Sequence, residues 1–151
     1  MNAKQLWSQQ SPPQKEDLIK ELIELKISGG WPRGLENALA RAINFRPSTL
    51  RHAEPAQLHR LLMRAIGLLP RQELLQLLVD FHRLCRPGVF GDLLAALQVP
   101  RDEELGPAPA ESEFNRSDAM GSLEAAIRKH PKDKIILGLD LLALWVDADR
   151  A

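Results

Sequence analysis

Arginine side chains carry most of the chemistry that this sequence could perform. Every Lys or Arg residue between Trp31 and Arg86 is an arginine, and the nine in this span are Arg33, Arg41, Arg46, Arg51, Arg60, Arg64, Arg71, Arg83 and Arg86. The guanidinium group is planar and always charged, and its forked donors fit phosphate or carboxylate. The pattern predicts a surface that contacts a negatively charged partner. The alternative is a set of solvated helix faces on which arginine takes the place of lysine.

Residues 39–51 form the one stretch whose pattern indicates more than packing. A short amphipathic helix would end at Ile43, and Asn44 tolerates the left-handed backbone that a helix end often needs. Ser48–Thr49 would then cap a second helix that carries Leu50 inward and basic side chains outward. This pattern resembles the helix-turn-helix of DNA-binding domains. The resemblance covers thirteen of 151 residues and implies that the second helix enters the major groove of DNA.

The candidate nucleic-acid-binding residues follow from this junction, which spans residues 35–54. Bases or flanking phosphates would be contacted by Ser48, Thr49, Arg51 and His52. Four more arginines would lie near the phosphate backbone: Arg41, Arg46, Arg60 and Arg64. An arginine-lined helical subunit that grips a nucleic-acid backbone inside a larger ribonucleoprotein assembly is an alternative that needs no groove-reading helix.

Enzymatic chemistry has little support in the sequence. It contains no tyrosine, and we find no phosphate-binding glycine loop and no Gly-x-Ser-x-Gly elbow. His82 and Cys85 stand three residues apart and could form half of a metal site, but structural metals usually need four ligands. We favour a packing role for this pair, with a small buried thiol beside a half-exposed imidazole. We therefore predict a protein that is not an enzyme and holds no metal or cofactor.

The elements that position these residues are expected to be helices, since no alternating strand pattern or hairpin dipeptide occurs. We predict a compact all-α bundle of about seven or eight helices built from helical hairpins. The expected segments are 11–28, 35–43, 48–54, 55–67, 71–84, 89–98, 117–129 and 133–147. Ser11 and Gln14 would form a capping box at the first helix, and Gly29–Gly30 would end it.

Composition divides the chain into three parts. Residues 1–98 would form a basic helical domain, and 99–117 an acidic, proline-containing linker before the last two helices. Residues 118–151 would form a C-terminal helical hairpin that packs on the core or makes an oligomer interface. The net charge of zero conceals +5 over residues 1–87 and −5 over the remainder.

The last helix is apolar on nearly every face, which indicates either a central position or cover by another chain. Its candidate interface residues are Leu139, Leu142, Trp145 and Val146. Trp7 is an isolated aromatic residue that could dock on a partner or fold back on the core. These features favour an alternative function, a helical protein–protein interaction module or adaptor. Arginines paired with Glu73 or Asp80 would favour that alternative, whereas a continuous arginine stripe would favour nucleic acid.

The function predicted first is that of a non-enzymatic helical nucleic-acid-binding protein, as a regulator or a subunit of a nucleoprotein assembly. Its partner would be nucleic acid or another protein, with a homo-oligomer through the C-terminal helix as one option. The single cysteine fits a reducing compartment, and no apolar run approaches the roughly 20 residues that span a bilayer. We therefore expect a cytoplasmic protein without a membrane partner.

Overall fold

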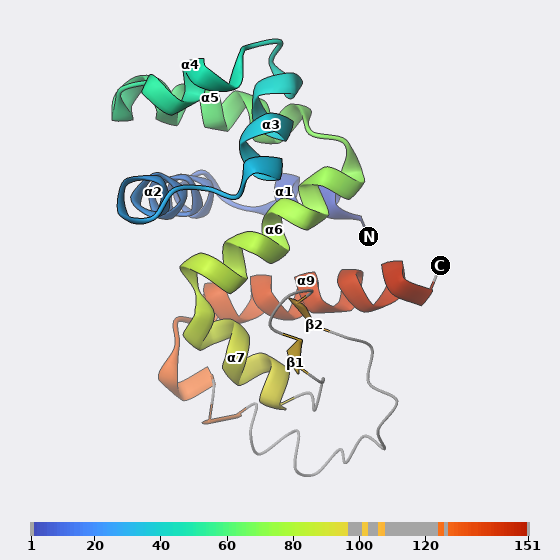
Figure 1. Ribbon diagram of the computed structural model, residues 1–151. Coiled ribbons are helices and arrows are strands. Elements are labelled where there is room, and N and C mark those ends of the chain that lie inside the picture. The colour runs from blue at the N-terminus through green and yellow to red at the C-terminus, as the bar shows by residue number, and fades with distance from the viewer. Residues whose placement is uncertain (1, 97–100, 103–105, 108–123, 126, 151) are drawn as a thin grey trace. The chain divides into compact units, whose positions relative to one another are not determined.

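The computed structural model describes residues 2–96, 101–102, 106–107, 124–125 and 127–150 (Figure 1). Nearly all of these residues are helical, which confirms the predicted all-α class. The chain divides into two units, Asn2–Leu77 and the residues from Leu78 onward, so the division falls within the helix α6 (Arg71–Cys85). The sequence instead suggests a boundary at the proline-containing linker.

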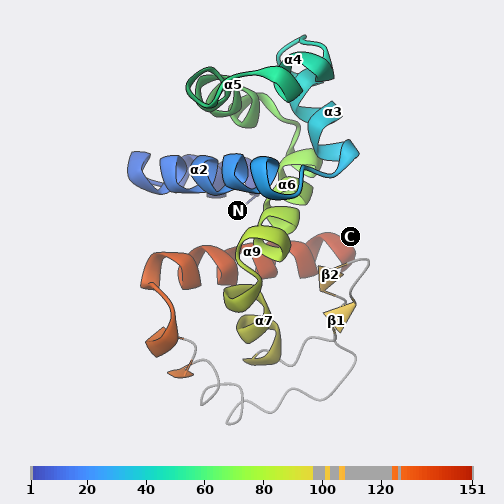
Figure 2. The same ribbon diagram turned by 60° about the vertical axis from the view of Figure 1, so that its left-hand side comes forward.

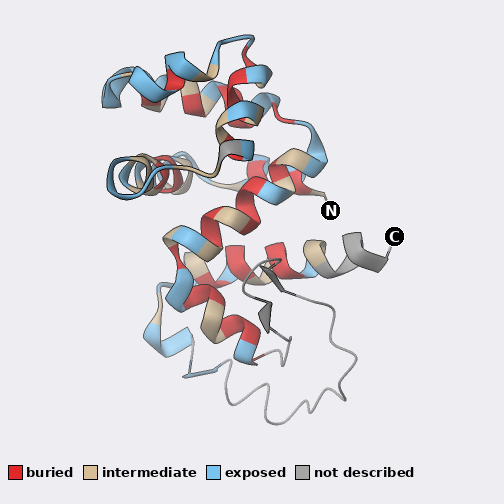
Figure 3. Ribbon diagram, in the orientation of Figure 1, coloured by how far each residue is buried: buried red, intermediate tan, exposed pale blue. Residues whose placement is uncertain are grey.

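The N-terminal unit is built from short helices joined by tight connections. Its elements are α1 (Ala3–Gln9), α2 (Pro12–Ser28), α3 (Arg33–Ala42), α4 (Pro47–His52), α5 (Pro55–Leu68) and the first part of α6. Helix α2 packs against α5, and α3 packs against both α4 and α5 (Figures 1 and 2). Figure 3 shows the buried residues along the helices. The largest fully buried side chains of this unit are Leu6, Leu18, Ile19, Leu22, Leu39, Leu50, Leu58, Leu62, Ile66, Leu69 and Leu74.

Helix α1 was not predicted from the sequence. It begins with a capping box, in which the Asn2 side chain accepts a hydrogen bond from the Gln5 backbone N–H at 3.0 Å and the Asn2 N–H donates to Gln5 Oε1 at 2.8 Å. The helix buries Leu6 and Trp7, so Trp7 takes the second of the two roles considered for it and folds back on its own unit. Lys15 lies over its indole ring, 5.4 Å from the centroid.

The predicted start and end of the next helix are confirmed. Ser11 caps α2 and forms a capping box with Gln14, and Pro12 occupies the first helical position. Such caps satisfy backbone N–H groups that have no partner within the helix. The helix ends at Ser28, and Gly30 follows with a φ of 78°, a conformation that glycine adopts without steric cost.

The C-terminal unit contains the rest of α6, α7 (Pro87–Ala96), helical residues 124–125 and 127–129, and α9 (Lys132–Arg150). Helix α7 begins at Pro87, two residues before the expected start at residue 89, since proline is tolerated in a first helical turn. Helix α7 packs against α9. The predicted cap at Ser117–Asp118 lies outside the described residues.

A short antiparallel pair of strands, β1 (Arg101–Asp102) and β2 (Gly106–Pro107), lies in the stretch assigned to a linker. Each strand has only two residues, too few to show the alternation by which strands are recognised in a sequence. This pair was therefore not predicted. None of the described helices has both the length and the apolar character needed to cross a membrane.

Candidate nucleic-acid interface

The junction between α3 and α4 has the geometry that Asn44 indicates in the sequence. Asn44 adopts a φ of 56°, which confirms the predicted left-handed turn. The N–H of Phe45 donates to the carbonyl of Ala40 at 2.9 Å, and the N–H of Asn44 donates to that of Arg41 at 3.2 Å. These two bonds form a Schellman motif, which satisfies carbonyls left open at the end of α3.

The start of α4 differs from the sequence-based prediction. Arg46 is the N-cap residue, Pro47 occupies the first helical position, and no side chain caps the helix. Because proline has a fixed φ and no N–H to satisfy, it begins the helix before Ser48 and Thr49. The prediction that Ser48–Thr49 caps this helix is therefore wrong. Both residues are exposed within its first turn.

Arg51 is held by an acidic residue of α3. Its Nε and Nη2 atoms donate to Glu36 Oε1 at 3.2 and 3.0 Å, and the Glu36 side chain is only 16% exposed. This ion pair ties the last turn of α4 to the first turn of α3, and it occupies two of the guanidinium donors. A base or phosphate would therefore compete with Glu36 for Arg51.

Arg41 is also paired within the N-terminal unit. Its Nη2 atom donates to Glu73 Oε1 of α6 at 3.0 Å, with side-chain exposures of 71% and 36%. Pairs this exposed contribute at most about 1 kcal/mol to stability, because water screens the charges. In the C-terminal unit Arg83 pairs with Asp80 at 3.1 Å. Pairing with Glu73 and Asp80 is what the interaction-module alternative anticipates.

Three candidate arginines differ from these, namely Arg46, Arg60 and Arg64. All three are exposed, and within the part of the chain that the structure describes none of them forms an ion pair. Arg60 and Arg64 stand four residues apart on α5 and share its solvent face, since Leu58, Leu62 and Ile66 are buried on the other face. The remaining candidates Ser48, Thr49 and His52 are exposed as well.

The charge of the N-terminal unit is unevenly distributed along the chain. Residues 33–71 contain seven arginines against Glu36 and Glu54, a net charge of +5. Helix α2 contains three lysines against four acidic residues, a net charge of −1. The positive charge therefore resides in α3, α4, α5 and the start of α6.

His82 and Cys85 lie in environments that differ from the predicted ones. The His82 imidazole is fully buried and the Cys85 thiol is half-buried. The sequence-based prediction was the reverse, a buried thiol and a half-exposed imidazole. His82 Nδ1 lies 2.8 Å from the carbonyl oxygen of Leu78, which requires the proton on Nδ1. Burial is the main cause that lowers the pKa of His82 from 6.5 to about 4, and the nearby Arg86 lowers it further. No group of three potential ligands that could hold a metal occurs among the described residues.

The predicted interface residues of α9 fall into different environments. Leu142 is buried within the chain, while Leu139 and Trp145 are half-buried. The side chain of Val146 lies outside the described part. Ile136, which was not among the predicted interface residues, is 48% exposed.

The described residues thus define an all-helical protein whose N-terminal unit has its excess positive charge in α3, α4, α5 and the start of α6. Comparison of the chain with protein-family models, with curated proteins and with solved structures finds no match. The residues that sequence reasoning missed here are Glu36, which holds Arg51, and Ile136. Nothing in the local pattern around either residue distinguishes it from neighbouring helix positions.

Proposed function

We propose that this protein is a non-enzymatic nucleic-acid-binding protein that contacts phosphates through Arg46, Arg60 and Arg64. The observation that carries the proposal is the pair Arg60 and Arg64, exposed one turn apart on α5 and without an acidic partner among the described residues. Guanidinium groups at this spacing can each engage a phosphate oxygen. Such a protein would serve as a regulator or as a subunit of a nucleoprotein assembly.

Binding through the backbone is supported better than reading of bases. Helix α4 has six residues, which corresponds to a length of about 9 Å. A recognition helix places several side chains along a groove, and here Arg51 is occupied by Glu36. The second helix of the junction therefore offers few free donors to base edges, whereas α5 offers two arginines that have no ion-pair partner among the described residues.

A titration at low and rising salt tests this proposal. We expect labelled duplex or single-stranded nucleic acid to bind at about 50 mM salt and to dissociate steeply as salt rises. Arg60→Gln with Arg64→Gln should weaken binding on the order of tenfold and reduce the logarithmic salt slope by about two. Fluorescence anisotropy measures both quantities.

The matched control is Lys20→Gln with Lys26→Gln, which removes the same charge from α2. It should leave the affinity nearly unchanged, because α2 carries net negative charge. Absence of binding to any duplex or single strand at low salt would refute the proposal. If both double variants lost the same affinity, the binding would depend only on the net charge of the protein and not on Arg60 and Arg64.

The second candidate function is a protein–protein interaction module that joins two copies of this chain through α9. It is favoured by Ile136, which is 48% exposed and shares a face of α9 with half-buried Leu139 and exposed Ala143. The pairing of Arg41 with Glu73 also fits this candidate, since it removes one arginine from the free cationic surface.

Ile136→Lys tests the second candidate. If α9 joins two copies, a charge on this face should shift the mass in solution from dimer toward monomer while the helical content stays unchanged. Sedimentation equilibrium gives the mass, and Ala143→Ser is a control for substitution on the same face. A wild-type chain that stays monomeric at high concentration would exclude this interface.

A further inference from the structure

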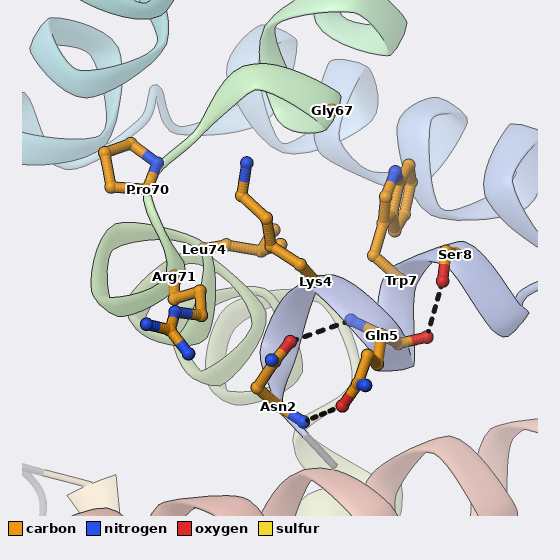
Figure 4. Close-up of a pocket in the computed structure, with 9 residues that line it drawn as sticks. All are labelled: Asn2, Lys4, Gln5, Trp7, Ser8, Gly67, Pro70, Arg71 and Leu74. Carbon is orange, nitrogen blue, oxygen red and sulfur yellow. Dashed lines mark hydrogen bonds between the residues drawn. The ribbon is translucent and has the colours of Figure 1, made fainter.

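A pocket of about 800 Å³ opens within the N-terminal unit, between α1 and the connection from α5 to α6 (Figure 4). Its volume lies in the range of pockets that hold small molecules. Residues of α1 form one wall, and residues from Gly67 to Leu74 form the other. None of the three arginines assigned to nucleic acid lines this pocket, so it is a separate site.

The charged side chains of the pocket are all cationic. Lys4 and Arg71 line it, and no acidic residue does. Both side chains are exposed, and across the described ranges of the chain neither forms an ion pair. In Figure 4 the Lys4 ammonium group extends toward the connection between Gly67 and Pro70, and Arg71 lies on the side of Asn2. The pocket therefore carries two positive charges that its own residues do not neutralise.

The capping box of α1 supplies further donors. Asn2 Oδ1 and Gln5 Oε1 must be the oxygen atoms of their amides, because each accepts from a backbone N–H. Their amide nitrogens, Asn2 Nδ2 and Gln5 Nε2, remain as donors on side chains that line the pocket. The capping box thus consumes the acceptors of both amides and leaves donors to a ligand.

Trp7 adds a hydrogen-bond donor at the wall of the pocket. Its side chain lines the pocket although the residue is only 6% exposed, and no described residue accepts a hydrogen bond from its indole N–H. Figure 4 shows the indole nitrogen on the edge of the ring that faces Lys4. The Trp7 N–H is not among the fully buried side-chain groups that lack a partner, so solvent reaches it, and an acceptor on a ligand in the pocket can take the place of that solvent.

The pocket also has apolar lining residues. Leu74 and Pro70 line the pocket together with the Trp7 ring, and Gly67 has no atom within 4 Å of the position that a Cβ would take. Helix α6 begins at Arg71, and the positive end of its dipole adds to the cationic character. A ligand that fits these walls combines an acceptor-rich anionic group with an apolar body.

We propose that this pocket binds a small organic anion, in which a carboxylate or phosphate lies between Lys4, Arg71 and the Trp7 N–H while an apolar or aromatic body lies against Leu74 and Pro70. The proposal goes beyond nucleic-acid binding and does not depend on it. Carboxylate and phosphate are both compact anions that accept several hydrogen bonds.

Phenyl phosphate and benzoate are suitable probes, and benzyl alcohol is their neutral counterpart. We expect calorimetric titration of the full chain to detect binding of at least one anion and none of benzyl alcohol. Lys4→Gln with Arg71→Gln should weaken that binding by at least roughly tenfold. Gly67→Leu should block the pocket without changing the charge, since space is open beside Gly67 and its backbone is not left-handed.

Lys20→Gln with Lys26→Gln is again the matched control and should leave binding of the anion intact, because neither lysine lines this pocket. Circular dichroism confirms that each variant is folded. The proposal is overturned if neither anion binds, or if the control weakens binding as much as the pocket variant does. It is also overturned if Gly67→Leu binds the anion like the wild type. Arg60→Gln with Arg64→Gln should bind the anion normally, so loss of nucleic-acid binding and loss of this site are distinguishable.

Discussion

Gly138→Leu is expected to separate α9 from α7 and to lower the free energy of unfolding of the C-terminal unit by about 3 kcal/mol. A Cβ atom at Gly138 would lie 2.5 Å from Leu93 Cδ1 and 3.9 Å from both Val89 Cγ1 and His82 Cδ2. Leu93 is fully buried, so its side chain has no solvent into which it could move. The two helices can therefore approach this closely only because residue 138 has no side chain.

Chemical denaturation followed by circular dichroism measures this loss. Ala143→Leu is the matched control, because Ala143 is exposed on the same helix and its substitution adds three carbon atoms, one fewer than Gly138→Leu. It should change stability by less than about 0.5 kcal/mol. Equal stabilities of the two variants would show that the close approach at Gly138 does not hold α9 in place.

The second large effect is loss of stability in mild acid through His82. Burial lowers the pKa of this imidazole from 6.5 to about 4, so between these pH values the unfolded chain binds a proton that the folded chain does not. Stability should therefore be fully present above pH 6.5 and fall as the pH approaches 4. The shift corresponds to about 3 kcal/mol, since each pKa unit is equivalent to roughly 1.4 kcal/mol.

The surroundings of His82 explain why the charged form is excluded. Phe81 and Phe90 lie 5.3 and 5.9 Å from its ring centroid, and no described residue bonds to Nε2. The guanidinium of Arg86, which lies 4.8 Å from the Phe81 ring, further opposes a second positive charge. Protonation would thus place a positive charge among aromatic rings, with an Nε2–H group that has no acceptor among the described residues.

His82→Leu tests this prediction because leucine has a similar volume and does not titrate. The variant should lose most of the pH dependence between pH 4 and 6.5, as seen in thermal unfolding at a series of pH values. His130 provides a contrasting imidazole, since it bonds to Asp92 Oδ2 at 2.7 Å and holds the pKa of that half-buried carboxyl below its usual value. Wild type and His82→Leu with parallel pH profiles would contradict the assignment to His82.

Much of the helical framework could be predicted because its signals are local. Ser11 and Gln14 mark the start of α2, and Asn44 marks the turn after α3, through contacts with residues at most a few positions away. Helix α1 was missed because its few apolar residues give no periodic stripe, although the Asn2 and Gln5 capping box is present in the sequence. Pro47 moved the start of α4 because its ring geometry outweighs the capping tendency of the two hydroxyl residues after it.

The sequence by itself determined that this chain is helical, where most helices begin and end, and that every Lys or Arg residue in the span 31–86 is an arginine. Only the tertiary structure decided which arginines form ion pairs with acidic residues of the chain. Arg51 pairs with a glutamate 15 positions away and Arg41 with one 32 positions away, whereas Arg46, Arg60 and Arg64 have no such partner among the described residues. Caps and helical periodicity act over one or two turns, but ion pairs, the burial of His82 and the enclosure of Trp7 depend on helices brought together by packing.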